Sequence, residues 1–300
     1  MSSTPFPKYY LTPRKLITLL KKRGLIINNE NSAEHLIQAI GYYRLSAYLY
    51  PLLATPKTLQ IFKSESNFET AVTLYNFDQE LRLFLFRYIA KIEVAIRSAI
   101  ANIVAEESNN IFWMTDKTMF VKEAIFNKTK SIIDNEIRSS NEEFIKHFKA
   151  KYSVPYPPAW MLVEVLPIGT LNHVYNNLSD NLLKKKVAAR FKLKEPIFRS
   201  WLTIIALTRN ACAHHARIWN KENAIPPKTP KKLDAPWISS SILKNRIFFN
   251  ISIIKYFIDS ISPLNEMKQE LTYLLKKYPT IDIAAMGFPP IWQKEPLWDK

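Results

Sequence analysis

Glycine and cysteine are the residues that this 300-residue sequence has least of. Its four glycines, Gly24, Gly41, Gly169 and Gly287, lie far apart. A P-loop and a dinucleotide-binding turn both need clustered glycines to bring the backbone close to phosphate, so the sequence argues against both kinds of nucleotide site. The single cysteine, Cys212, excludes an internal disulfide and a cysteine-rich zinc site, which fits a reducing compartment.

Long uncharged hydrophobic runs are missing as well. Charges such as Arg87, Lys91, Lys244 and Lys255 interrupt the most hydrophobic stretches, so we expect no transmembrane helix and no membrane partner. The N-terminal sequence MSSTPFPKYYLTPRKL lacks the apolar core of a signal peptide. These absences predict a soluble, cytoplasmic protein.

Acidic residues are too few to balance the basic ones. There are 42 lysines and arginines against 26 aspartates and glutamates, which gives a formal net charge of +16. Such an excess attracts polyanions, and nucleic acid first, because binding releases condensed counterions. A general bias toward lysine, isoleucine and asparagine explains the same charge, so charge alone leaves RNA binding open.

The apolar residues recur with helical periodicity, which predicts an all-α fold. Thr12 and Pro13 are a cap and a first helical residue, and we expect that helix to close at Gly24. A second helix is expected from about residue 31 until Pro51 breaks it.

A long helix forms the expected centre of the fold. Ser66 and Glu69 have the spacing of a capping box, and the helical pattern after them runs to about Glu106. Later helices are expected within 117–150, from residue 160 with an interruption at 167–169, and over 194–220, 241–261 and 264–278, with an exposed proline-rich loop over 222–240. We expect an N-terminal helical region over 1–60 and a larger helical domain with an irregular C-terminal tail over 61–300, together forming one integrated unit.

The stretch LTRNACAHHARIWN, residues 207–220, holds two of the five histidines. On a helix that turns about 100° per residue, four polar side chains share one side with Ala206 and Ala213: Arg209, Asn210, His214 and Arg217. The inward side carries a mainly apolar set: Ile204, Leu207, Ala211, His215, Ile218 and Trp219. We therefore expect His215 in the core and His214 on the polar side, where it is either catalytic or an ordinary surface residue.

Arg209 to His214 matches the Arg-Asn-x-x-x-His signature of HEPN ribonucleases. The wider TRNACAHHARIWN resembles the abortive-infection family of bacterial anti-phage proteins, the AbiD and AbiF group. Four other stretches agree with that family: IGYYRLSAYLYPL, KIEVAIRSAI, PPAWMLVEVLPIGTLNHVYNNL and MGFPPIW. The resemblance covers nearly the whole chain.

The resemblance implies a HEPN-like helical bundle with additional N-terminal and C-terminal helices. Members of the HEPN class typically dimerise with their motifs facing each other and cleave RNA without a metal or another cofactor. It thus implies a homodimer in which His214 is the general acid or base and Arg209 stabilises the phosphate. Asn210 would orient the imidazole or bond the neighbouring subunit, and Arg217 would contact RNA.

Two further clusters have two interpretations each. Glu93 and Arg97, four residues apart on the long helix, form either a surface ion pair or a support for Arg209, since KIEVAIRSAI is one of the resembling stretches. In GYYRLSAYLY, Tyr42, Tyr43 and Arg44 either present a stacking platform to RNA bases or belong to an aromatic core, which is the commoner case.

The leading functional hypothesis is a metal-independent endoribonuclease in phage defence or with a toxin role. It would cleave RNA through attack of the 2′-hydroxyl, with RNA as its substrate. The alternative is a non-catalytic RNA-binding or scaffold protein that holds a structured noncoding RNA. The intact Arg209, Asn210 and His214 favour the enzyme, because binding needs positive charge but no histidine.

Overall fold

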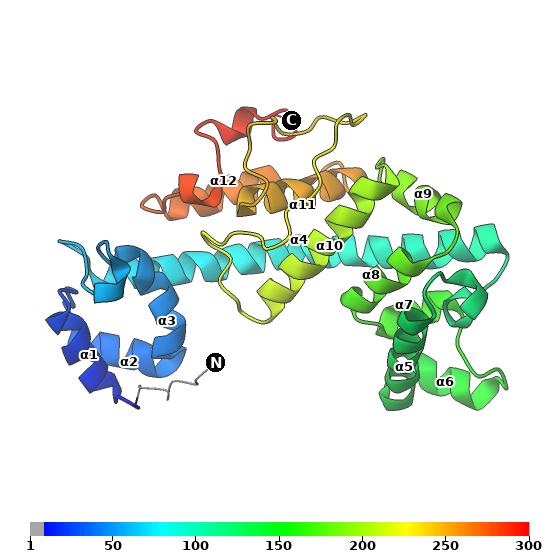
Figure 1. The fold of residues 1–300 in the computed structure, drawn as a ribbon, viewed down its shortest axis with the longest axis horizontal. Coiled ribbons are helices and arrows are strands. Elements are labelled where there is room, and N and C mark those ends of the chain that lie inside the picture. Colours follow the sequence, from blue (N-terminus) through cyan, green and yellow to red (C-terminus); the bar gives the residue numbers. More distant parts are fainter. Residues whose placement is uncertain (1–8, 300) are drawn as a thin grey trace, which may run out of the picture. The chain divides into compact units, whose positions relative to one another are not determined.

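The computed structural model describes residues 9–299, and their regular structure is helical. These residues form twelve α-helices and six short 3-10 helices, with three isolated β-bridges and no strand (Figure 1). The predicted all-α fold class is confirmed. Within the described residues, no helix combines the length and the hydropathy needed to cross a membrane.

The chain divides into two compact units. One contains the residues up to Leu81 together with Leu274–Ile281, and the other contains Arg82–Tyr273 and the residues from Asp282 onward. The long helix α4, Phe68–Ser108, contributes to both units. The domain boundary expected near residue 60 stays a prediction, since compactness alone does not define a domain.

The first unit contains α1, Pro13–Lys22, α2, Glu30–Ile40, and α3, Tyr42–Leu49, together with the beginning of α4. α1 starts as predicted, because Thr12 Oγ1 accepts a hydrogen bond from the Lys15 backbone N–H at 3.4 Å and Pro13 is the first helical residue. Its end at Gly24 is also confirmed, and Gly24 has a φ of +90°.

α2 and α3 replace the single helix expected between residue 31 and Pro51. Gly41 separates them with φ +85° and ψ 132°, a conformation that L side chains rarely adopt. α3 then packs on α2 and is fixed to α4 by a buried bond, in which the Tyr48 hydroxyl donates to Asp78 at 2.6 Å. The apolar periodicity continued across Gly41 and concealed this break.

The start of α4 also differs from the prediction. Asn67, not Ser66, is the capping residue: its Oδ1 accepts a hydrogen bond from the Thr70 backbone N–H at 2.8 Å. The Ser66 hydroxyl instead donates to the Leu52 carbonyl at 3.3 Å. The expected capping box was therefore wrong by one residue, although α4 itself runs to Ser108 as expected.

The second unit adds seven helices to α4 and to most of α12, Met267–Lys277: α5, Glu123–Ser139, α6, Glu143–Lys151, α7, Ala159–Val165, α8, Ile168–Asn177, α9, Asn181–Ala189, α10, Glu195–Ala213, and α11, Ile247–Ile261. α8 packs against both α5 and α10, and α10 also packs against α9 and α11 (Figure 1). The predicted interruption at Pro167 separates α7 from α8 and is confirmed.

Residues 222–240 lack α-helix, as expected, but they are not an entirely exposed loop. The Trp237 ring packs on the buried Trp201 at a centroid distance of 4.6 Å, and Ile238 is buried. The Trp201 indole N–H donates to the Lys228 carbonyl at 3.0 Å. The aromatic core at the N-terminal part of α10 therefore anchors this proline-rich segment.

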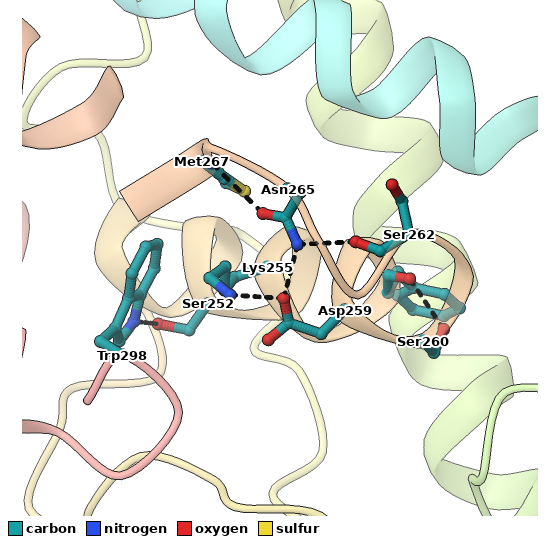
Figure 2. Close-up of polar contacts among 9 residues, drawn as sticks. Ser252, Lys255, Asp259, Ser260, Ser262, Asn265, Met267 and Trp298 are labelled. Atoms are coloured by element: carbon teal, nitrogen blue, oxygen red, sulfur yellow. Dashed lines mark hydrogen bonds and ion pairs between the residues drawn. The ribbon is translucent and has the colours of Figure 1, made fainter. Parts of the chain in front are cut away.

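α11 is buried over most of its length and contains a buried ion pair between Lys255 and Asp259 (Figure 2). Asn265 Nδ2 donates to Asp259 Oδ1 at 2.8 Å, which ties the turn after α11 to the pair. One turn earlier, Ser252 Oγ accepts from the Trp298 indole N–H at 3.2 Å. These contacts attach the C-terminal segment to α11.

Neutralising one member of this pair should destabilise the protein more than neutralising both. Lys255→Met leaves the Asp259 carboxylate without its cation and should lower the free energy of unfolding by about 3–5 kcal/mol. The double variant Lys255→Met/Asp259→Asn removes both charges and keeps an acceptor for Asn265, so it should lose less. Urea denaturation measures both values. An equally unstable double variant would show that packing of the Lys255 stem, not charge, dominates.

Candidate active site

The polar residues around Arg209 lie at the C-terminal end of α10, which ends at Ala213. His214 is the capping residue, and His215 adopts a left-handed backbone with φ +54°. The His215 N–H donates to the Cys212 carbonyl at 3.2 Å, and the Ala216 N–H donates to the Ala211 carbonyl at 2.9 Å. This pair of bonds is a Schellman motif, with histidine at the position that usually holds glycine.

The early end of α10 overturns the core position expected for His215. His215 is exposed, because the helical angle assigned to it does not apply beyond Ala213. Two assignments inside the helix were also wrong: Leu207 is 48% exposed, and Ala206 is buried. Ala206 precedes Arg209 by one helical turn, so this side of α10 is covered at Ala206, while the Arg209 side chain itself stays 33% exposed.

Arg209, Asn210 and His214 remain close together despite the shorter helix. The His214 N–H donates to the Asn210 carbonyl at 2.9 Å, which keeps the two residues one helical turn apart. Arg209 Nη1 donates to Asn210 Oδ1 at 3.4 Å. Arg209 and Asn210 are half-buried, whereas His214 is exposed. The three residues form one polar cluster at the end of α10, which we call the α10-end cluster.

Glu93 on α4 joins Arg209 to Arg97. Glu93 Oε1 accepts a hydrogen bond from Arg97 Nη2, and Glu93 Oε2 lies 3.4 Å from Arg209 Nε. The side chains of Glu93 and Arg97 are only 13% and 12% exposed, so the interpretation as a surface ion pair is wrong. Arg209 Nε makes no directed hydrogen bond within the described residues, so its attraction to Glu93 is electrostatic.

Arg97 also connects this carboxylate to the corner between α7 and α8. Its Nη1 donates to the Leu166 carbonyl at 2.6 Å and to the Val163 carbonyl. The final carbonyls of a helix lack partners within the helix, and Pro167 has no N–H to offer them. Arg97 therefore satisfies the end of α7 while it pairs with Glu93.

Two contacts from α4 were not anticipated from the sequence. The Phe86 ring lies under Arg209, with the guanidinium carbon 5.9 Å from its centroid, and Arg82 Nη1 donates to the Ala216 carbonyl at 3.4 Å. Phe86 precedes Glu93 by seven residues, which places both on the same helical face. That spacing is the signal that could have identified Phe86. α4 therefore contacts the end of α10 on both sides of the turn.

The other predicted residues have different surroundings. Arg217 follows the turn after α10 and is half-buried, outside the helix on which it was placed. Tyr43 and Arg44 belong to the first unit, where both are exposed on α3. Core packing is therefore wrong for Tyr43, although it holds for Tyr48 on the same helix.

The charges on and beside the α10-end cluster suit an anionic ligand. Arg97 and Arg209 carry two positive charges, and Glu93 supplies one negative charge, so one positive charge remains uncompensated. The Arg209 side chain is 33% exposed, which leaves part of its planar fork of donors accessible to phosphate oxygens. His214 adds an exposed imidazole beside these donors. Among the described residues, no group of three or more histidine, cysteine or carboxylate side chains could hold a metal ion.

Comparison with known proteins finds one family. Residues 35–220, more than half of the chain, match the model of the family described as Abi-like protein. The match contains α4, Glu93, Arg97 and the whole α10-end cluster. No curated protein and no solved structure matches the chain.

The left-handed backbone at His215 predicts opposite effects for two substitutions. Glycine adopts this conformation without strain, so His215→Gly should leave the free energy of unfolding within about 1 kcal/mol of the wild-type value. His215→Val places a β-branched side chain there and should lower it by roughly 1–2 kcal/mol or more. Thermal unfolding followed by circular dichroism measures both. Equal destabilisation by the two variants would contradict a backbone origin and assign the effect to the imidazole.

Proposed function

This chain belongs to the Abi-like protein family, and on that premise we propose that it is a metal-independent endoribonuclease that acts in phage defence by abortive infection. The observation that carries the proposal is the α10-end cluster, in which an exposed imidazole lies one turn from Asn210 beside an arginine held by Glu93. RNA binding needs positive charge such as that of the arginines, whereas proton transfer needs a group such as His214.

RNA supplies its own nucleophile, which limits what the protein must do. The 2′-oxygen attacks the adjacent phosphorus while the bond from phosphorus to the 5′-oxygen breaks, giving a 2′,3′-cyclic phosphate and a 5′-hydroxyl. One proton leaves the 2′-hydroxyl and another joins the 5′-oxygen. His214 transfers one of these protons, and Arg209 stabilises the negative charge that develops on the non-bridging oxygens.

Glu93 and Asn210 are positioning residues in this scheme. The carboxylate of Glu93 attracts Arg209 Nε, and Asn210 Oδ1 accepts from Nη1, which leaves Nη2 of Arg209 for a phosphate oxygen. Phe86 supports the guanidinium from below, which limits the orientations that Arg209 can adopt. Asn210 accepts from Arg209 through its side chain and bonds His214 through its carbonyl, and so couples the two catalytic groups.

Replacing His214 tests the reaction directly. His214→Ala should reduce cleavage of labelled RNA in the presence of EDTA by roughly 10²–10⁴-fold, because a proton-transfer group is lost. His147→Ala, which changes another exposed histidine of the same unit, should cleave like wild type. The wild-type products should end in a cyclic phosphate.

Three results would contradict the enzyme assignment. These are cleavage that requires a divalent metal, equal cleavage by the His214→Ala variant, and RNA binding by wild type without any cleavage. The last result would support the alternative function, in which the protein holds a structured noncoding RNA.

We further propose that two copies of the chain form the active unit. The reaction moves two protons, and each α10-end cluster contains one imidazole, that of His214. The α4 face that carries Glu93 and Arg97 supplies an apolar contact area. Six residues of this face fall within an arc of about 100° on the helix: Leu83, Phe86, Ala90, Glu93, Val94 and Arg97. The four uncharged ones are exposed, with Val94 64% exposed. A second copy on this face would bring its own cluster close to Arg209.

Mixing subunits tests whether both histidines serve one site. Wild-type and His214→Ala chains are combined at rising ratios and allowed to exchange, and RNA cleavage is followed. If the active unit needs both imidazoles, activity should fall as the square of the wild-type fraction. Sedimentation should show a dimer for the wild type and a monomer for Val94→Asp. A linear fall, or full activity from a monomeric sample, would contradict the composite site.

A further inference from the structure

The first unit contains a large groove that the cleavage chemistry does not use. Its volume is about 900 Å³. α1 and the turn between α2 and α3 form most of its wall, and the segment before α1 completes it. The lining is mostly aromatic and apolar side chains, with Arg23, Gln38 and Gln60 as its polar members.

Three of the lining tyrosines are almost fully exposed. Tyr9, Tyr10 and Tyr43 have exposed fractions of 82%, 83% and 93%. Tyr48, on the same helix as Tyr43, is by contrast buried and bonded to Asp78. α3 therefore fixes itself with one tyrosine and presents another to solvent, so the exposed ring is not needed for the helix to pack.

The backbone at Gly41 determines where the exposed ring lies. Gly41 lines the groove, and its φ of +85° turns the chain so that α3 begins there with Tyr42 and Tyr43. Leu16 and Leu19 of α1 line the same groove. The result is an apolar surface flanked by flat, exposed rings.

Positive charge borders this surface. Arg23 lines the groove, and no acidic partner for it is found within the described residues. Arg14 and Lys21 on the same helix are paired, with Glu34 at 2.8 Å and with Glu30 at 2.5 Å. The groove thus combines aromatic rings with an available guanidinium, which fits a ligand that has flat aromatic groups on an anionic backbone.

We propose that this groove binds single-stranded RNA by stacking bases on the exposed tyrosines and pairing a phosphate with Arg23. The choice of RNA as the ligand rests on the proposed function. It extends that function by assigning substrate binding to the first unit. Bases stack on aromatic rings with little regard to sequence, and each stacked base contributes about tenfold or more to affinity. Duplex RNA keeps its bases paired and cannot use the rings, so the groove selects unpaired segments.

Binding is measured on the full chain carrying His214→Ala, so that RNA stays intact. The probe is a fluorescent single-stranded RNA, and polarisation gives its affinity. Tyr43→Leu should weaken binding about tenfold, and Tyr43→Phe, which keeps the ring, should bind as before. Tyr273→Leu changes an exposed tyrosine of the other unit and should have no effect. Circular dichroism verifies that each variant folds.

An abasic strand of equal length separates stacking from charge. It should bind more weakly than RNA and should not distinguish Tyr43→Leu from the parent chain. The proposed binding role of the groove would be wrong if Tyr43→Leu bound RNA as tightly as the parent chain. It would also be wrong if Tyr43→Phe lost as much RNA affinity as Tyr43→Leu. Wild type is assayed for cleavage in parallel. If wild type cleaves RNA but Tyr43→Leu does not change the affinity, only the proposed RNA-binding role of the groove is contradicted. If binding depends on the Tyr43 ring but wild type does not cleave RNA, only the proposed nuclease activity is contradicted.

Discussion

The second unit depends on one carboxylate that serves two guanidinium groups. Glu93 faces Arg97 on its own helix and Arg209 on α10, and both contacts are largely removed from water. A low local dielectric strengthens these attractions, and it also strengthens the repulsion that two arginines would feel without the carboxylate. The position of Arg209 is therefore a property of α4 as much as of the helix that carries it.

Local signals predicted most helices but missed those boundaries that depend on a single backbone conformation. The start of α1 followed from Thr12 and Pro13, because a cap and a first-turn proline act within one turn. Gly41 looked like a tolerated glycine inside a continuous apolar pattern, yet its positive φ ends α2. The end of α10 gave no signal at all, since a histidine occupies the position where glycine would mark a stop.

The candidate site was predictable only within the helices. Arg209 and Asn210 belong to the last turn of α10, and the spacing from Asn210 to His214 survives because a backbone bond spans it. The spacing of Glu93 and Arg97 predicted their pairing, but it contained no information on Arg209, which is 116 residues away from Glu93 in the sequence and meets it through tertiary packing. The burial of Ala206 was not predicted for the same reason, because a helical wheel cannot tell which neighbouring element packs on a given face.

The three-way contact at Glu93 also sets an order in which the site can be assembled during synthesis. Arg97 cannot reach its carbonyl partners until Leu166 has been made, and Glu93 lacks its second arginine until residue 209 has left the ribosome. A nascent chain that ends between residues 108 and 209 contains the whole α4 sequence but lacks Arg209. The charge arrangement at Glu93 is therefore complete only when more than two thirds of the chain has been translated.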